Sequence, residues 1–323
     1  MKVFVTGGAG FVGSICVERL LDRGDEVFVF DNLSEGHRQA VDPRAILIQG
    51  DLSDPKSISL AIETSAPSAV MHFAASALVA ESMADPGKYF HNNVSGGLNL
   101  LQAMLENGVK RIVFSSSCAT FGIPEKLPID EDMPQHPINP YGESKLMFEK
   151  ILRWFDQIHG LTCVTLRYFN VAGASAKLGE THRPETHLIP RILQVALGQL
   201  SHAEIFGTDF ETPDGTCIRD YVHVLDLASA HILALSYQKS DSFNLGTGGG
   251  TSVKEILEAC RRVSGHPIPA IERTPRPGDP PRLVASSEKT KRELHWDPQF
   301  ADIEAIVQSA WRWHVAHPHG YPD

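Results

Sequence analysis

The chain has 323 residues, of which 42% are hydrophobic and 21% are charged, a composition that excludes an intrinsically disordered protein. The net charge of −10 gives no reason to expect binding to nucleic acid or to an anionic membrane surface. No apolar run reaches the roughly 18 residues that suggest a membrane span. The N-terminus lacks the features of a signal peptide, so we expect a cytoplasmic protein.

Cysteine and histidine show no metal-binding pattern. The five cysteines are scattered and form no Cys-x-x-Cys pair, so we expect neither disulfide bonds nor a zinc site. His314, His317 and His319 are close in sequence near the C-terminus. We interpret them as a solvated tail, because no carboxylate or cysteine lies beside them at metal-ligand spacing. We therefore expect no bound metal ion.

Strands and helices alternate along the first half of the chain. Short apolar runs predict strands at 3–5, 27–30, 46–48, 69–73, 111–114 and 163–166. Helical patterns cover 11–23, 86–108 and 141–159. Apolar strands separated by helices are typical of a parallel sheet that is covered on both faces. We therefore predict an α/β domain with a doubly wound parallel sheet over residues 1–170.

The second half is less regular, and prolines and glycines are frequent in it. Helical patterns cover 188–199, 224–237, 252–264 and 302–316. The segment 242–247 resembles another strand, which we expect to return to the main sheet. Residues 171–323 should thus form mainly a smaller ligand-binding lobe that is interwoven with the first domain.

A glycine-rich turn directly follows the first predicted strand. Gly7, Gly10 and Gly13 have the spacing G-x-x-G-x-x-G and open the first predicted helix. In this setting the three glycines permit a tight turn, a close approach of the backbone to a pyrophosphate, and close packing of helix on strand. The helix N-terminus adds amide donors for the anion. A plain tight turn is the alternative reading, but the position favours a dinucleotide site.

Further cofactor candidates lie where predicted strands end. Asp31 ends the second strand, where a carboxylate accepts hydrogen bonds from ribose hydroxyls and repels a 2′-phosphate, which favours NAD over NADP. Asp51 and Leu52 follow the third strand and could reach the adenine. Residues 73–75 follow the fourth, where small side chains let the backbone lie against the cofactor. Sheets of this kind bind ligands at the carboxyl ends of their strands.

Tyr141 and Lys145 are four residues apart and share one face of a predicted helix. A nearby ammonium group and a cationic nicotinamide lower the pKa of a tyrosine, which can then act as a general base. Ser117 ends a run of serines after the fifth strand and could relay a substrate proton to the tyrosine. Such a pair is often only a surface feature, but together with the glycine turn it predicts a catalytic site.

These features resemble the extended short-chain dehydrogenases/reductases, and among them the UDP-galactose 4-epimerase family. The resemblance extends over essentially the whole chain. It rests on the glycine turn and on residues 72–75, 92–94, 115–122, 141–145, 167–170, 183–190, 215–224, 276–279 and 313–322. It implies a Rossmann-type fold, bound NAD, a UDP-sugar substrate, and a homodimer formed through the helices near 86–108 and 141–159.

The resemblance also implies roles for individual residues. The implied catalytic residues are Ser117, Tyr141 and Lys145. The implied NAD contacts are Gly7, Gly10, Phe11, Val12, Gly13, Asp31, Asn32, Asp51, Leu52, Phe73, Ala74, Ala75, Asn92, Ser115, Tyr141, Lys145 and Tyr168. The implied substrate contacts are Ser117, Tyr141, Phe169, Asn170, His187, Leu188, Phe206, Arg219, Tyr221, Arg276, Asp279 and Leu283. The two arginines suit a diphosphate, although each could instead pair with a nearby acid.

The residues after the catalytic serine separate this chain from its sibling enzymes. Related dehydratases and decarboxylases place carboxylates there, whereas this chain has Cys118 and Ala119. Oxidation and re-reduction at one carbon remain, which implies interconversion of UDP-glucose and UDP-galactose through a 4-keto sugar that turns before hydride returns. In the family, the residue at the position of Leu283 sets the space beside carbon 2 of the sugar. Some turnover of N-acetyl sugars is therefore kept as an alternative. The alternatives are an epimerase or dehydrogenase for UDP-N-acetylglucosamine, UDP-xylose or UDP-arabinose, and a sensor without catalysis.

Overall fold

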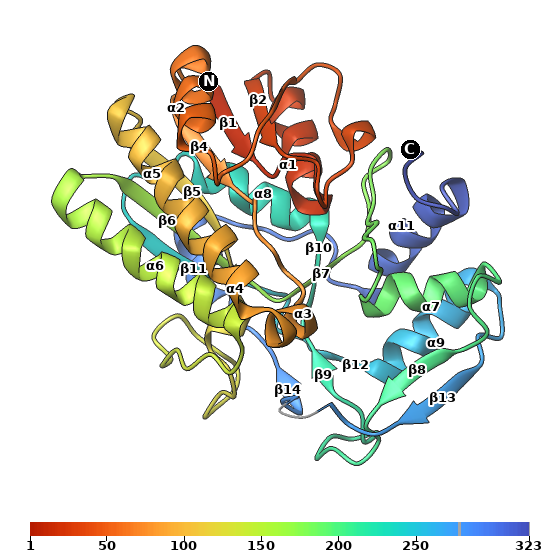
Figure 1. The fold of residues 1–323 in the computed structure, drawn as a ribbon. Coiled ribbons are helices and arrows are strands. Elements are labelled where there is room, and N and C mark those ends of the chain that lie inside the picture. The colour runs from red at the N-terminus through yellow and green to blue at the C-terminus, as the bar shows by residue number, and fades with distance from the viewer. Residues whose placement is uncertain (277–278, 323) are drawn as a thin grey trace.

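The computed structural model describes residues 1–276 and 279–322, and it is built around one parallel sheet (Figure 1). Within the described residues this sheet has seven strands in the order β11-β6-β5-β4-β1-β2-β3. They are β1 (Lys2–Thr6), β2 (Glu26–Asp31), β3 (Ile46–Gln49), β4 (Ala69–His72), β5 (Arg111–Ser117), β6 (Thr162–Tyr168) and β11 (Asp241–Leu245). The strand order reverses between β1 and β4, which places a ligand-binding switch point beside the end of β1. The predicted Rossmann-type fold is confirmed.

Helices cover both faces of the sheet (Figure 1). On one face, α1 (Phe11–Asp22) and α8 (Val224–Ala234) pack on a core that includes Val3 and Val5. On the other face, α2 (Pro55–Ser65), α5 (Gly96–Glu106) and α6 (Pro140–His159) pack on a core that includes Phe4. Successive side chains of a strand point to opposite faces. Because both faces are buried, the strands are apolar almost throughout.

A smaller lobe has its own core. It contains α7 (Leu188–Ala196), α9 (Val253–Ser264), α11 (Ile303–Ala316), and the parallel pair β8 (Ala203–Phe206) and β13 (Ala270–Arg273). The chain passes from this lobe back to the main sheet to form α8 and β11, so the lobes are interwoven (Figure 1). No helix of the described residues is long and apolar enough to cross a membrane.

Short strands lie between the two cores. β7 (Asn170–Ala172) pairs with β10 (Tyr221–His223), and β9 (Ile218–Arg219) pairs with both β12 (Thr251–Ser252) and β14 (Arg282–Leu283). The helix α10 (Glu288–Leu294) then packs near β11. These strands matter for the site, because residues 170, 219, 221 and 283 all lie on them.

The predicted helix over 86–108 is three segments in the structure. These are α4 (Pro86–Tyr89), a π-helical stretch (Phe90–Ser95) and α5. The π-helical stretch carries Asn93, whose side-chain oxygen accepts from the Ser76 N–H and whose amide donates to the Ser144 hydroxyl, both at 2.9 Å. The irregular stretch thus ties the end of β4 to the helix that carries the catalytic candidates.

Two further expectations differ from the structure. The helices α2 and α3 (Val79–Ala84) were not predicted from the sequence. Asp54 caps α2 by accepting hydrogen bonds from two backbone N–H groups, and the helix begins at Pro55. The solvated histidine tail is wrong in part, because α11 runs as far as Ala316. His314 is buried on this helix, and the ring of His317 stacks on Trp313 at 4.9 Å.

Candidate active site

The glycine turn leaves no room for side chains at two of the three glycines of its G-x-x-G-x-x-G motif. Gly7 has a φ of +72°, and a Cβ there would lie 2.5 Å from the Ala74 backbone nitrogen. A Cβ on Gly13 would lie 2.1 Å from the carbonyl oxygen of Gly7. At Gly10, in contrast, the nearest atom to a Cβ would be 3.5 Å away. The protein's own packing therefore explains Gly7 and Gly13 but not Gly10, which leaves backbone open to a ligand.

The start of α1 is built for an anion. Within the described residues, no side chain caps the helix at Gly10 and no acidic residue lies in its first turn. The half-buried side chains of Phe11 and Val12 pack into the core, and no side chain among residues 1–276 and 279–322 caps the first backbone amides of the helix. These amides and the helix dipole favour a bound anion. A dinucleotide pyrophosphate fits this site.

The carboxylate of Asp31 lies at the end of β2, beside this turn. It accepts hydrogen bonds from the backbone N–H groups of Ala9 at 2.9 Å and Leu33 at 2.8 Å. Burial raises the pKa of Asp31, and the two amide hydrogen bonds oppose that shift. Each carboxylate oxygen keeps further acceptor capacity. Asp31 can therefore receive ribose hydroxyls without giving up its own fixed position.

Next along this edge of the sheet, the Asn32 amide donates to Asp51 at 2.7 Å, and this hydrogen bond lowers the pKa of that carboxyl. Leu52 is only 5% exposed and packs in the core beneath α5. The Asp51 carboxylate can thus offer polar contacts to a ligand here, whereas the Leu52 side chain is withdrawn into the core.

The ends of β4, β5 and β6 extend the same site. Phe73 is half-buried beside the ring of His231, with the ring centroids 4.8 Å apart. Ala74 and Ala75 follow it and are themselves only partly buried. The Ser115 hydroxyl lies 2.7 Å from the Tyr168 hydroxyl. Asn92, in the π-helical stretch, donates to the Asn93 side chain at 3.0 Å.

Lys145 reaches across from α6 to the end of β5. Its ammonium group donates to the carbonyl oxygen of Ser115 at 2.8 Å and lies 5.9 Å from the ring centroid of Tyr141. Burial lowers the pKa of Lys145 to about 7, and the charge of Glu149 opposes this shift. The structure thus brings the predicted lysine and tyrosine together with the serine run.

Tyr141 lies on the first turn of α6, where Asn139 caps the helix and Pro140 is its first residue. The tyrosine is 8% exposed, and burial raises its pKa above the ordinary range, whereas the hydroxyl of Ser117 acts in the opposite direction. The neighbouring lysine was expected to lower the pKa of Tyr141. In the protein alone burial dominates, and the pKa of Tyr141 is raised instead.

The candidate substrate residues form a second group. Arg219 on β9 donates to the Asp279 carboxylate at 2.6 Å, and Leu283 on β14 pairs with Arg219 in register. The guanidinium carbon of Arg276 lies 4.2 Å from the ring centroid of Phe206. Pro277 and Gly278, which belong to the matched segment 276–279, lie outside the described residues.

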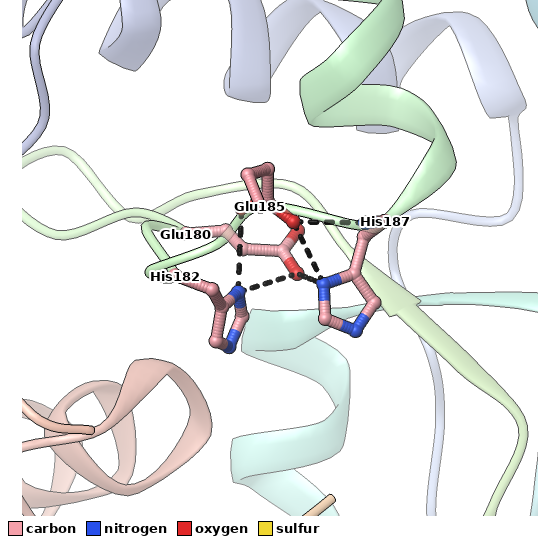
Figure 2. Close-up of side chains that lie close together, drawn as sticks. All are labelled: Glu180, His182, Glu185 and His187. Carbon is pink, nitrogen blue, oxygen red and sulfur yellow. Dashed lines mark hydrogen bonds and ion pairs between the residues drawn. The ribbon is translucent and has the colours of Figure 1, made fainter. Parts of the chain in front are cut away.

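Other candidates on this side come from the short strands and from α7. Phe169 is buried in a small core that Leu283 also contacts. The backbone of Asn170 donates to the carbonyl of Asp220 at 2.9 Å, and Tyr221 is buried on the neighbouring strand β10. Leu188 is the first residue of α7. His187 directs Nδ1 toward two glutamates (Figure 2), and these contacts belong to a separate cluster of side chains.

The family model of NAD dependent epimerases/dehydratases matches residues 3–246. The chain belongs to this family. The UDP-glucose 4-epimerase of Streptococcus mutans serotype c is 55% identical to it over 100% of this chain and 99% of that protein. A crystal structure of a UDP-glucose 4-epimerase has a TM-score of 0.98 at 48% identity and full coverage of both chains. The UDP-glucose 4-epimerase of Bifidobacterium longum, solved with NAD+ and UDP, has a TM-score of 0.95 at 36% identity, covering 99% of this chain and 100% of that one.

One buried polar residue near the site was not predicted from the sequence. Glu149, one turn after Lys145 on α6, accepts from the Ser116 hydroxyl at 2.6 Å and from the guanidinium of Arg167 at 2.7 Å. The charged pair is buried, and it joins α6 to β5 and β6 beneath the catalytic candidates. The sequence did contain a signal, since Arg167 lies inside an apolar strand. A charge buried in this way needs a partner of opposite charge.

Proposed function

We propose that the protein interconverts UDP-glucose and UDP-galactose by transient oxidation at carbon 4 of the sugar. The observation that carries this proposal is the convergence of Tyr141, Lys145 and the β5 serines at the same carboxyl edge of the parallel sheet as the glycine turn. Similar full-length chains support it, since the UDP-glucose 4-epimerase of Streptococcus mutans serotype c is 55% identical over 100% of this chain. Cys118 and Ala119, which follow Ser117, supply no carboxylate for chemistry at other carbons.

The cofactor that fits is NAD. The pyrophosphate would lie against Gly10 and the start of α1, and Asp31 would hold the adenosine ribose. When bound, NAD accepts the hydrogen of sugar carbon 4 as hydride and returns it. The carboxylate of Asp31 disfavours a 2′-phosphate, because two negative charges would be brought together.

The protein's own part in the reaction is proton transfer and positioning. Tyr141 takes the proton of the 4-hydroxyl, directly or through the hydroxyl of Ser117, and gives it back when the carbonyl is reduced. Lys145, fixed by the Ser115 carbonyl, favours the phenolate when it is charged. The sugar must present both faces in turn, so the nucleotide carries the binding energy. Arg219, Arg276 and their neighbours would hold the UDP while the 4-keto ring rotates.

The test compares wild type with Tyr141→Phe, incubated with UDP-galactose and no added cofactor. Wild type should form UDP-glucose without net NADH, and the variant should lose about 10²- to 10⁴-fold in rate. Tyr237→Phe is the matched control, because Tyr237 lies near the opposite end of β5. The Arg111 guanidinium donates to the Tyr237 carbonyl there, and the Tyr237 hydroxyl donates to Glu293. Full activity of Tyr141→Phe would overturn the mechanism, and steady NADH formation would indicate a net dehydrogenase.

We further infer that the active protein is a cytoplasmic homodimer joined through α5 and α6. Leu98 on α5 and Met147, Trp154 and Ile158 on α6 are exposed apolar side chains, and Trp154 is 62% exposed. A dimer would cover them. Light scattering should give a dimer for wild type and a monomer for Trp154→Glu, with Leu60→Glu as a control on an exposed leucine of α2.

The cytoplasmic location is supported by the cysteines. All five form no disulfide bond, as suits a reducing compartment.

A further inference from the structure

Four side chains of the segment before α7 converge on one small volume (Figure 2). They are Glu180, His182, Glu185 and His187, and each offers one ligand atom. These four atoms all lie within 4.8 Å of one another. The set contains two imidazole nitrogens and two carboxylate oxygens, and only His187 among the four was a candidate substrate contact.

Four nitrogen–oxygen separations in this cluster are close to those around a tetrahedral metal ion. Nδ1 of His187 lies 2.9 Å from a Glu185 oxygen and 3.1 Å from a Glu180 oxygen. Nδ1 of His182 lies 3.3 Å from the other Glu185 oxygen and 3.5 Å from the Glu180 oxygen. Ligands placed about 2.0–2.1 Å from zinc at tetrahedral corners are about 3.3 Å apart. The two histidines meet different oxygens of Glu185, so a shell with one oxygen from each glutamate forms after the side chains draw together from within 4.8 Å.

The ligand atoms are held in position by the surrounding chain. The Glu185 carboxylate accepts from the backbone N–H groups of Thr186 at 2.9 Å and His187 at 2.8 Å. Both histidines face the cluster with Nδ1 and turn Nε2 away from it (Figure 2). The backbone hydrogen bonds to Glu185 orient its carboxylate, and such orientation of a metal ligand raises metal affinity.

Burial and access also suit an ion. Glu180 is only 5% exposed, and a buried carboxylate is costly unless a cation or hydrogen-bond donors meet it. The side chains of His182 and His187 are 26% and 43% exposed. A cavity of about 260 Å³ borders Glu180, His182 and Glu185 and extends to His314 and His319, so an ion has a path to the cluster.

We propose that Glu180, His182, Glu185 and His187 bind a divalent metal ion, and that zinc fits best. Mixed nitrogen and oxygen donors suit zinc, whereas calcium and magnesium prefer oxygen ligands. Four protein ligands close a tetrahedral shell, which makes the site structural rather than catalytic. The ion would fasten residues 180–187 directly before α7. This inference does not rest on the epimerase activity, because metal binding is measured without substrate.

The competing explanation is an ion-pair network in which protonated histidines meet the two glutamates. The experiment therefore uses untagged holoenzyme, prepared without added metal, and measures its zinc content by mass spectrometry. We expect about one zinc per chain. After removal of metal by a chelator, titration with Co²⁺ should produce the visible absorption of a tetrahedral site, and Zn²⁺ should abolish it. A chain that carries no zinc and binds neither ion would establish the ion-pair network and overturn the proposal.

Variants locate the site. His182→Ala and Glu185→Gln should each weaken Zn²⁺ binding by at least about tenfold and remove the increase in melting temperature that Zn²⁺ gives. His202→Ala is the matched control, because His202 bonds to the Ser201 hydroxyl outside the cluster. Retained NAD shows that each variant is folded. Unchanged zinc affinity in both cluster variants would overturn the assignment of these ligands.

Discussion

The guanidinium group of Arg219 donates to the carboxylate of Asp279 at 2.6 Å, although 60 residues separate them in sequence. Both are proposed UDP contacts. The arginine side chain is 12% exposed and the aspartate 30%, so the aspartate fixes an arginine that is already largely withdrawn from solvent. The arginine's position is thus set before any diphosphate binds.

Arg219→Met should therefore weaken UDP-sugar binding. Charged hydrogen bonds contribute about 1.5–3 kcal/mol, which corresponds to roughly a tenfold to hundredfold loss in kcat/KM. Asp279→Asn should have a smaller effect, because the asparagine oxygen still accepts. The measurements are kcat/KM with UDP-galactose and calorimetric binding of UDP. Arg262→Met, which removes only a surface pair with Glu304, is the control. Wild-type UDP affinity in Arg219→Met would rule out this contact.

The glycine turn separates a folding role from a cofactor role. Gly13→Ala should destabilise the protein, since its Cβ would lie 2.1 Å from the Gly7 carbonyl oxygen. Gly10→Ala should fold normally, because the nearest atom is 3.5 Å away and the φ of −83° suits alanine. It should nevertheless lose NAD if the pyrophosphate lies against this residue. Thermal melting and the NAD released on denaturation distinguish the two outcomes. A Gly10→Ala protein with full NAD content would place the pyrophosphate elsewhere.

Lys145 gives the stability a defined pH dependence. Burial lowers its pKa to about 7, whereas an unfolded lysine titrates near 10.4. Between these values the unfolded chain binds more protons, so the free energy of unfolding rises with pH. Below pH 7 the folded protein carries the full cost of burying the charge. Lys145→Met should therefore gain stability relative to wild type at pH 6, and this gain should shrink toward pH 9.

The measurement is urea unfolding at several pH values with NAD content matched between the proteins. Lys110→Met provides a control, because Lys110 is exposed and donates to the His159 carbonyl. A stability difference between Lys145→Met and wild type that does not change with pH would show that the folded protein does not depress this pKa.

Leu283 should set the size of the sugar that is accepted. It is half-buried on β14 and contacts the small core that contains Phe169. Leu283→Tyr fills space, so it should lose turnover of UDP-N-acetyl sugars before that of UDP-galactose, whereas Leu283→Ala should favour the larger sugars. Steady-state rates with both substrates give the ratio. A ratio unchanged in Leu283→Tyr would show that Leu283 does not face the sugar.

The sheet and the glycine turn could be predicted because their signals are local. Val3, Phe4 and Val5 must all be apolar in a strand buried on both faces, and Gly7 follows closely after them. Contacts between distant residues could not be predicted in this way. The pairing of Arg167 with Glu149 and the burial of Tyr141 depend on how separate elements pack.

The cluster of Glu180, His182, Glu185 and His187 is a different case. Its spacing, E-x-H-x-x-E-x-H, was present in the sequence. His314, His317 and His319, which were weighed as a metal site, have no such carboxylates beside them, whereas His182 and His187 do. If zinc binds as proposed, the expectation of a metal-free protein is wrong at this segment.

β11 completes the edge of the sheet from far along the chain, pairing with β6 over residues 241–245. A fragment ending at residue 170 would leave β6 as an open edge and, without α8, would leave uncovered the part of one apolar face that α1 does not cover. Such a fragment should aggregate rather than serve as a free-standing cofactor domain. The smaller lobe is therefore no detachable module. Any exchange of lobes between relatives, in evolution or in the laboratory, must leave β11 and α8 with the sheet they complete.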